Sequence, residues 1–351
     1  MKIHFRPVLF FLCIALAAAA GLGGVFVFNQ RFQKFLLNQT LKRVQPAATV
    51  TVFQYQKKTI HFPTALDLDN VHVSIQKDRE LWDLQCSSIR MALKQPFWKR
   101  DLDADIDMDG CDAQSSGIAL ERGNLRAIAQ LSSRHFTSLK GDLHLARVGL
   151  GQVSMTDVHS PLEVDAREIR LEGWTANAYG GTVTGKIFVD YTPPVNYSIE
   201  LNLTRIDLDS LQPADTSIYS KMSGQVSGTA KIEGGLKKIA TLESDLDIPE
   251  GGKIKAAWLK PIMEYVPFDL QKKKLEALIR TDGVIPVEKA RLTFQSIVPE
   301  KVAGVWNIKS ANLDLDLNMD FTINFEPGTG IKDFYDQVLM RMLPLKGGTH
   351  E

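Results

Sequence analysis

Two of the three cysteines, Cys86 and Cys111, stand in neighbouring runs of alternating apolar and polar residues, where side chains on adjacent strands can react. The connection between these runs, Lys94–Arg100, is short and contains Pro96, as a hairpin loop would. The alternation places both cysteines on the polar face, two or three positions out of register, and a bulge at Ser87–Ser88 would close that gap. We therefore predict a disulfide in an oxidising compartment, with two unpaired thiols as the alternative.

The acidic run Asp103–Gly110 carries aspartates at alternate positions before a glycine, as the start of an EF-hand calcium loop does. Its twelfth position, counted from Asp105, is Ser116 rather than a bidentate glutamate. The intervening residues are apolar, which favours the polar face of a strand. The Ser-x-x-Lys match at Ser74 ends a strand and has no helix to orient its lysine. Together with seven scattered histidines, these patterns predict no metal site, no cofactor and no catalytic residue, so we do not expect an enzyme.

The charge of the chain is balanced overall but not along its length. The 351 residues hold 41 Lys and Arg against 41 Asp and Glu, which gives no general basic surface for nucleic acid. The first 66 residues hold eight basic residues and no acidic one, so the remainder carries the opposite net charge. Three cysteines exclude a disulfide-dense small domain.

An uncharged stretch of 22 residues, 7–28, is long enough to cross a bilayer as a helix. We predict a cytoplasmic tail over 1–6, an uncleaved transmembrane signal anchor over 7–28 and a juxtamembrane amphipathic helix over 29–45. A cleaved signal peptide is the main alternative for the span, and docking on the β domain is the alternative for the amphipathic helix. Basic residues flank both ends of the span, so the local charge does not fix its orientation. The charge rule also weakens when a long domain must be translocated, as in the orientation that we predict.

The chain changes from a helical period to a period of two after Pro46, and this alternation continues through about a dozen runs. A register step near Asp69–Asn70 indicates a bulge. The fold class we predict is mostly β, a long, curved antiparallel sheet over 46–330 with a taco-like groove. Few helices are available to cover its apolar face, and the candidates are 125–133, 258–264, 272–279 and a C-terminal amphipathic helix that begins the segment 331–351.

The run NAYGGTVTGKIFVDYTPPVNYSIELNLTRIDLDSL (Asn177–Leu211), followed by MSGQVSGTAKIEGG (Met222–Gly235), resembles the repeat pattern of AsmA-like proteins. His61–Val73 is similar to the early strands of that family, and Gly283–Ser296 to its C-terminal region. The resemblance implies a bridge-like lipid-transfer protein of a double-membrane bacterial envelope, anchored in the inner membrane and supporting outer-membrane biogenesis. It implies a periplasmic β-sheet whose apolar interior carries phospholipid acyl chains. The runner-up is GspN, a small inner-membrane component of type II secretion with a similar plan.

Side chains of one parity along the strands would line such a groove. These lipid-groove candidates are Ile187, Val189, Ile199, Leu201, Leu203, Leu313, Leu315, Leu317 and Met319. The alternative is ordinary core packing in a structural or assembly subunit of an envelope or secretion machine. Membrane phospholipid, the inner membrane and envelope proteins are the partners we expect, with no nucleic acid.

Overall fold

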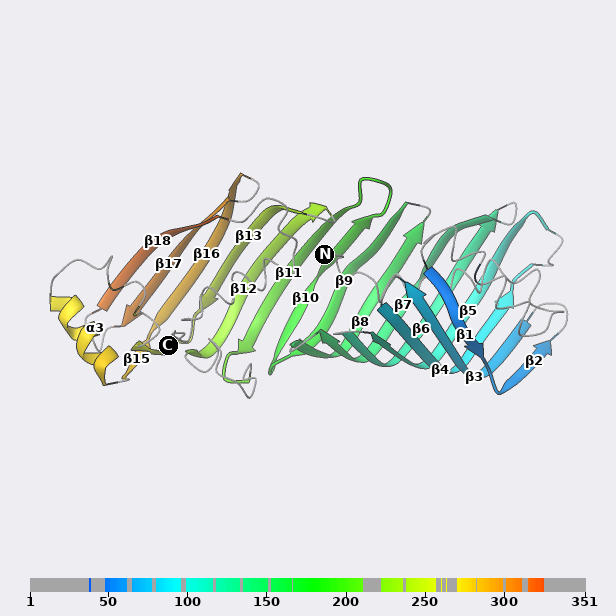
Figure 1. The fold of residues 1–351 in the computed structure, drawn as a ribbon, viewed down its shortest axis with the longest axis horizontal. Helices are drawn as coiled ribbons and strands as arrows, with labels where there is room; N and C mark the ends of the chain where they lie inside the picture. Colours follow the sequence, from blue (N-terminus) through cyan, green and yellow to red (C-terminus); the bar gives the residue numbers. More distant parts are fainter. Residues whose placement is uncertain are drawn as a thin grey trace, which may run out of the picture. The chain divides into compact units, whose positions relative to one another are not determined.

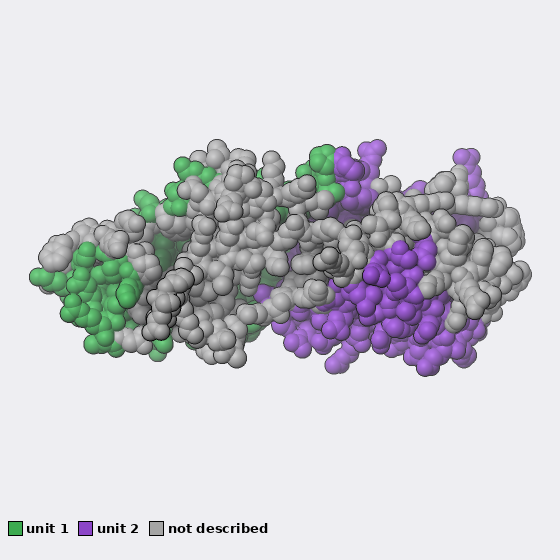
Figure 2. Space-filling view, viewed as in Figure 1, with its two compact units in different colours: residues 1–3, 177–185, 194–351 green, residues 4–176, 186–193 purple. Residues whose placement is uncertain are grey.

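The computed structural model describes Asn38 and most of 48–324. The gaps within this range are 62–64, 78–79, 96–98, 116–117, 133–134, 151–152, 166, 211–221, 236–237, 257–259, 261–262, 264–269, 282, 299–300 and 311–314. The chain divides into two compact units, coloured separately in Figure 2. Of the described residues, unit 2 comprises those up to Ala176 together with Lys186–Pro193, and unit 1 comprises Asn177–Gly185 and those from Pro194 onward.

Unit 2 is an antiparallel sheet whose consecutive strands β3 to β8 pair in sequence order and lie side by side in Figure 1. The short strands β1 and β2 both pair with β3, along different parts of it. The bounds are β1 Ala48–Gln54, β2 Lys57–His61, β3 Ala65–Lys77, β4 Glu80–Leu93, β5 Asp101–Ser115, β6 Ile118–Ser132, β7 His135–Leu150 and β8 Val153–Asp165. The next strands, β9 (Glu168–Ala178) and β10 (Gly181–Asp190), contribute residues to both units.

A line of bulges crosses unit 2 from β3 to β8. Each strand has two successive outward residues, after which the buried side chains change parity. These pairs lie at corresponding register positions on β3, β4 and β5 and on β6, β7 and β8, with a step between β5 and β6. Left-handed backbone marks four of these strands, at Asn70, Gly110, Arg122 and Asp157. Bulges bend a strand and increase its twist, so a line of them across neighbouring strands bends the sheet. The bulge predicted at Asp69–Asn70 is confirmed, and it belongs to this line.

The same bulges change the position of the cysteines. Cys86 and Cys111 lie directly opposite each other on β4 and β5, joined by a disulfide with their Cα atoms 4.0 Å apart. Both side chains are buried, on the apolar face rather than the polar face that simple alternation predicts. That placement was wrong because both strands change parity between the cysteines and the hairpin loop, at Ser87–Ser88 and Asp109–Gly110.

The strands of unit 1 are also antiparallel: β11 pairs with β12, β12 with β13, β13 with β16, β16 with β17 and β17 with β18. Two short strands, β14 and β15, pair with each other, and β14 also pairs with the start of β12. The helix α3 lies in the connection between them, beside β15 (Figure 1). The bounds are β11 Asn196–Asp207, β12 Met222–Gly235, β13 Lys238–Ile248, β14 Gly252–Lys255, α3 Leu270–Arg280, β15 Val284–Val287, β16 Lys289–Val298, β17 Lys301–Ser310 and β18 Leu315–Asn324.

The helix α3 closes a small core at this end of unit 1. Its Leu275 is buried with Ile254 of β14, Ile285 of β15 and Ile308 of β17. Leu278 and Ile279, one turn further along the helix, are partly buried against the same cluster. This spacing of three and four residues is the apolar stripe of an amphipathic helix, and it confirms the helix predicted over 272–279.

The chain is mostly β, as predicted, but one predicted helix was wrong. Residues 125–133 were expected to be helical, whereas the structure places 125–132 in β6. Leu125, Ala127, Ala129 and Leu131 are buried at alternate positions, and Arg126, Ile128 and Gln130 are exposed. The high helix propensity of these residue types hid the two-residue period, and pairing with β5 and β7 decided the outcome.

The membrane-proximal predictions, 1–6, 7–28 and most of 29–45, lie outside the described residues, as do 331–351 and most of 258–264. In the described part of the chain, no helix is both long and apolar enough to span a membrane. The described residue Asn38 receives a backbone hydrogen bond of 2.6 Å from Val50 of β1 through its Oδ1 atom.

Candidate functional site

Three rows of side chains cross unit 1 on one face of its sheet. Residues directly opposite each other in an antiparallel pair share a face, so the register of the strands defines these rows. The rows are Ile199–Ile232–Leu242, Leu201–Ala230–Ser244, and Leu203–Gly228–Leu246–Leu292–Trp306. We call the set Ile199, Leu201, Leu203, Ala230, Ile232, Leu246, Leu292 and Trp306 the apolar face of unit 1.

All eight members of the apolar face of unit 1 are partly exposed. The same side of the sheet also has buried side chains: Leu242, at the end of the first row, and Ile248, Ala290 and Ile308, which form the row beyond Leu246. The corresponding face of unit 2 differs, because its apolar side chains are buried; Leu84 and Leu139, for example, are 0% exposed. The apolar side chains are therefore a filled core in unit 2, whereas in unit 1 the eight named residues remain accessible beside a smaller buried core. Such a contiguous apolar surface is typical of a binding site.

The opposite face of the same strands is charged and internally paired. Arg291 of β16 donates from Nε and Nη2 to the two carboxylate oxygens of Asp245 on β13, at 2.8 and 2.5 Å. These hydrogen bonds hold the pKa of Asp245 below its usual value. On β12, Lys231 lies 3.0 Å from Glu233, whose hydrogen bond raises the pKa of Lys231. The sheet of unit 1 thus has one hydrated face and one apolar face.

The structure brings three of the predicted groove residues together on this face: Ile199, Leu201 and Leu203 of β11. Ile187 and Val189 lie on the part of β10 that belongs to unit 2, Ile187 partly exposed and Val189 buried. The candidates of the last strand are only partly described. Leu315, Leu317 and Met319 belong to β18, opposite Ser310, Ile308 and Trp306, and Leu313 lies outside the described residues.

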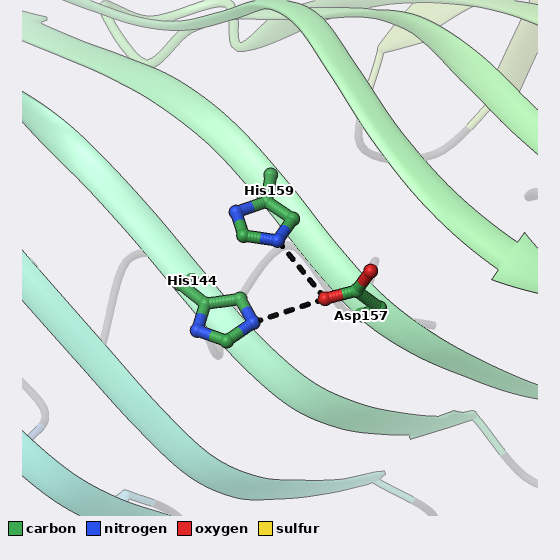
Figure 3. Close-up of side chains that lie close together, drawn as sticks. All are labelled: His144, Asp157 and His159. Carbon is green, nitrogen blue, oxygen red and sulfur yellow. Dashed lines mark hydrogen bonds and ion pairs between the residues drawn. The ribbon is translucent and has the colours of Figure 1, made fainter.

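Sequence reasoning missed one cluster of polar residues, on the outer face of unit 2. His144 of β7 lies directly opposite His159 of β8, and both rings approach the carboxylate of Asp157 (Figure 3). The available signal was parity: His144 stands between Leu143 and Leu145, so it must face outward. The pairing register that joins it to His159 cannot be read from the sequence, because the bulges shift it.

Comparisons with protein-family models, with characterised proteins and with solved structures find no match for this chain. The described residues form a mostly β protein, and in unit 1 part of one sheet face is apolar and partly exposed.

Proposed function

We propose that this protein binds or transfers phospholipid, with acyl chains lying on the apolar face of unit 1 and the headgroup in solvent. The observation that carries this proposal is the partial exposure of all eight members of that face. Each methylene group removed from water contributes about 0.8 kcal/mol, so acyl chains lying across several strands would bind without a polar pocket. This mode of binding needs no catalytic residue.

The resemblance to AsmA-like proteins supports a setting for this activity. In this proposal the uncharged stretch 7–28 anchors the chain in the inner membrane of a double-membrane bacterium, and the β units lie in the periplasm. A taco-like groove formed by the sheet would hold the lipid, and the protein would support outer-membrane biogenesis. An oxidising periplasm is also the compartment in which a Cys86–Cys111 disulfide persists.

Photo-crosslinking tests where the lipid lies. Phospholipid carrying a diazirine at the end of one acyl chain is added to the full chain and irradiated, and peptides are then mapped by mass spectrometry. We expect adducts mainly on peptides from β11 and β12, because these two strands carry five of the eight members of the apolar face. Adducts confined to the outer polar residues, or labelling no greater than that of an unrelated β protein, would contradict the proposal.

The second candidate is a structural or assembly subunit, similar in plan to GspN and without lipid carriage. The buried apolar face of unit 2 favours it for that part of the chain, since a filled core leaves no room for a ligand. The lipid-binding protein and the assembly subunit lead to different expectations for unit 1 only. An assembly subunit would give no acyl-chain adducts there, even at saturating lipid.

A further inference from the structure

The outer face of unit 2 carries a cluster of three potential metal ligands, His144, Asp157 and His159 (Figure 3). Antiparallel pairing sets the two histidines opposite each other, with their rings stacked at a centroid distance of 4.1 Å. Asp157 stands two residues before His159 on the same strand, so its side chain faces the same side. The cluster is therefore built from two adjacent strands rather than from a mobile loop.

The line of bulges positions the carboxylate. Asp157 adopts a left-handed backbone conformation, with φ of 52°, beside the point where β7 and β8 both change parity. Non-glycine residues hold this conformation only where the surrounding structure fixes it. Asp157 Oδ1 consequently lies between the rings, 2.9 Å from His159 Nε2 and 3.2 Å from His144 Nε2.

The spacing of these atoms matches that of ligands around one ion. Two ligand atoms bonded at about 2.0–2.1 Å to a tetrahedral Zn²⁺ lie about 3.3 Å apart. One ligand atom from each of the three residues falls within 4.8 Å of the others, before any ion draws them together.

Arg147, three residues after His144 on β7, pairs with groups other than the carboxylate of Asp157. Arg147 of β7 donates from Nε to Ser154 at 3.1 Å, and its Nη1 lies 3.6 Å from Glu121. The side chains of His144, Asp157 and His159 thus contact one another, whereas Arg147 pairs with Ser154 and Glu121. Two nitrogen ligands and one oxygen ligand suit Zn²⁺, Cu²⁺ or Ni²⁺ and disfavour Ca²⁺ and Mg²⁺, which take oxygen ligands.

We propose that His144, Asp157 and His159 form a surface site for one divalent transition-metal ion of the zinc and copper class. The two Nε2 atoms and one carboxylate oxygen are its protein ligands, and water or a group from another molecule completes the coordination. A bound ion joins β7 to β8 next to the line of bulges. It therefore stabilises the bend of unit 2, independently of lipid binding in unit 1.

The test is a metal titration of the full chain, purified without a polyhistidine tag and freed of metal by a chelator. Adding Co²⁺ as a spectroscopic probe should give visible absorption bands that saturate at one ion per chain, and Zn²⁺ should displace it. The variants His144→Gln and His159→Gln should each weaken Zn²⁺ binding at least about tenfold, because each removes one of three ligands. Zn²⁺ should also raise the melting temperature of the wild type and not that of either variant.

The matched control is His61→Gln. His61 lies 2.9 Å from Asp67, so this pair reproduces one histidine–aspartate contact without a second histidine. Binding in the control should equal that of the wild type. Equal affinity in the wild type and in both cluster variants, or an equal loss in the control, would overturn the proposal. So would the absence of Co²⁺ bands at millimolar metal.

Discussion

A Leu201→Asp variant is expected to fold normally and to lose its bound phospholipid. Leu201 is partly exposed on β11, where it begins the second row of the apolar face of unit 1, so an aspartate there remains hydrated in the lipid-free state. An acyl chain lying over it would remove that water, and burying an unpaired carboxylate is costly. Circular dichroism and urea unfolding measure the fold, and phosphate analysis of the extracted lipid measures the loss.

Two control variants bracket this result. Leu139→Asp places the same charge at a side chain of unit 2 that is 0% exposed, and it should prevent folding of that unit. Leu201→Met keeps the volume and the apolar surface, and it should retain lipid. If Leu201→Asp unfolds as Leu139→Asp does, the face is a closed core. If it folds and retains wild-type lipid, the lipid lies elsewhere.

Removing the disulfide is expected to destabilise unit 2 and leave unit 1 unchanged. The bond links residues 25 positions apart in β4 and β5, and a loop of this size stabilises by roughly 2–4 kcal/mol. The double variant Cys86→Ala, Cys111→Ala avoids leaving a single reactive thiol. Hydrogen exchange of the β4 and β5 amides should become faster by the corresponding factor, whereas exchange in β16 and β17 should not change.

Reductant provides the control for that comparison. Dithiothreitol should lower the protection of β4 and β5 in the wild type and have no further effect in the double variant. Thiol labelling of the folded wild type without reductant should modify no cysteine other than the third one, Cys13, in the stretch 7–28. Two reactive thiols beyond Cys13 would contradict the bond, and so would equal protection in the wild type and the double variant.

The periodicity of the sequence predicted the β fold because each strand buries one face, and burial imposes a period of two on residue type. It also located the bulge near Asp69–Asn70, where two outward residues follow each other. It did not reveal that a bulge recurs on every strand from β3 to β8. Serine, glycine and arginine at these positions fit either face, so only the strand register exposes the pattern.

The alternation of residues along each strand also predicted only part of the apolar face of unit 1. Ile199, Leu201 and Leu203 were predicted from alternation along one strand, and the structure adds the partners that continue their rows, such as Ile232 and Trp306. The third row depends on the pairing of β13 with β16 across the β14–α3–β15 insertion. A non-consecutive pairing of this kind leaves no local signal in the sequence. The partial exposure that separates unit 1 from unit 2 is likewise a property of packing.

Native mass spectrometry of the full wild-type chain, purified in detergent and released gently, tests phospholipid binding most directly. We expect a population heavier than the bare chain by the mass of phospholipid. Fragmentation of this population should yield intact lipid, and Leu201→Asp should abolish it. Phospholipid binding would be contradicted if the spectrum showed the bare-chain mass alone while circular dichroism of the same sample showed an intact β fold.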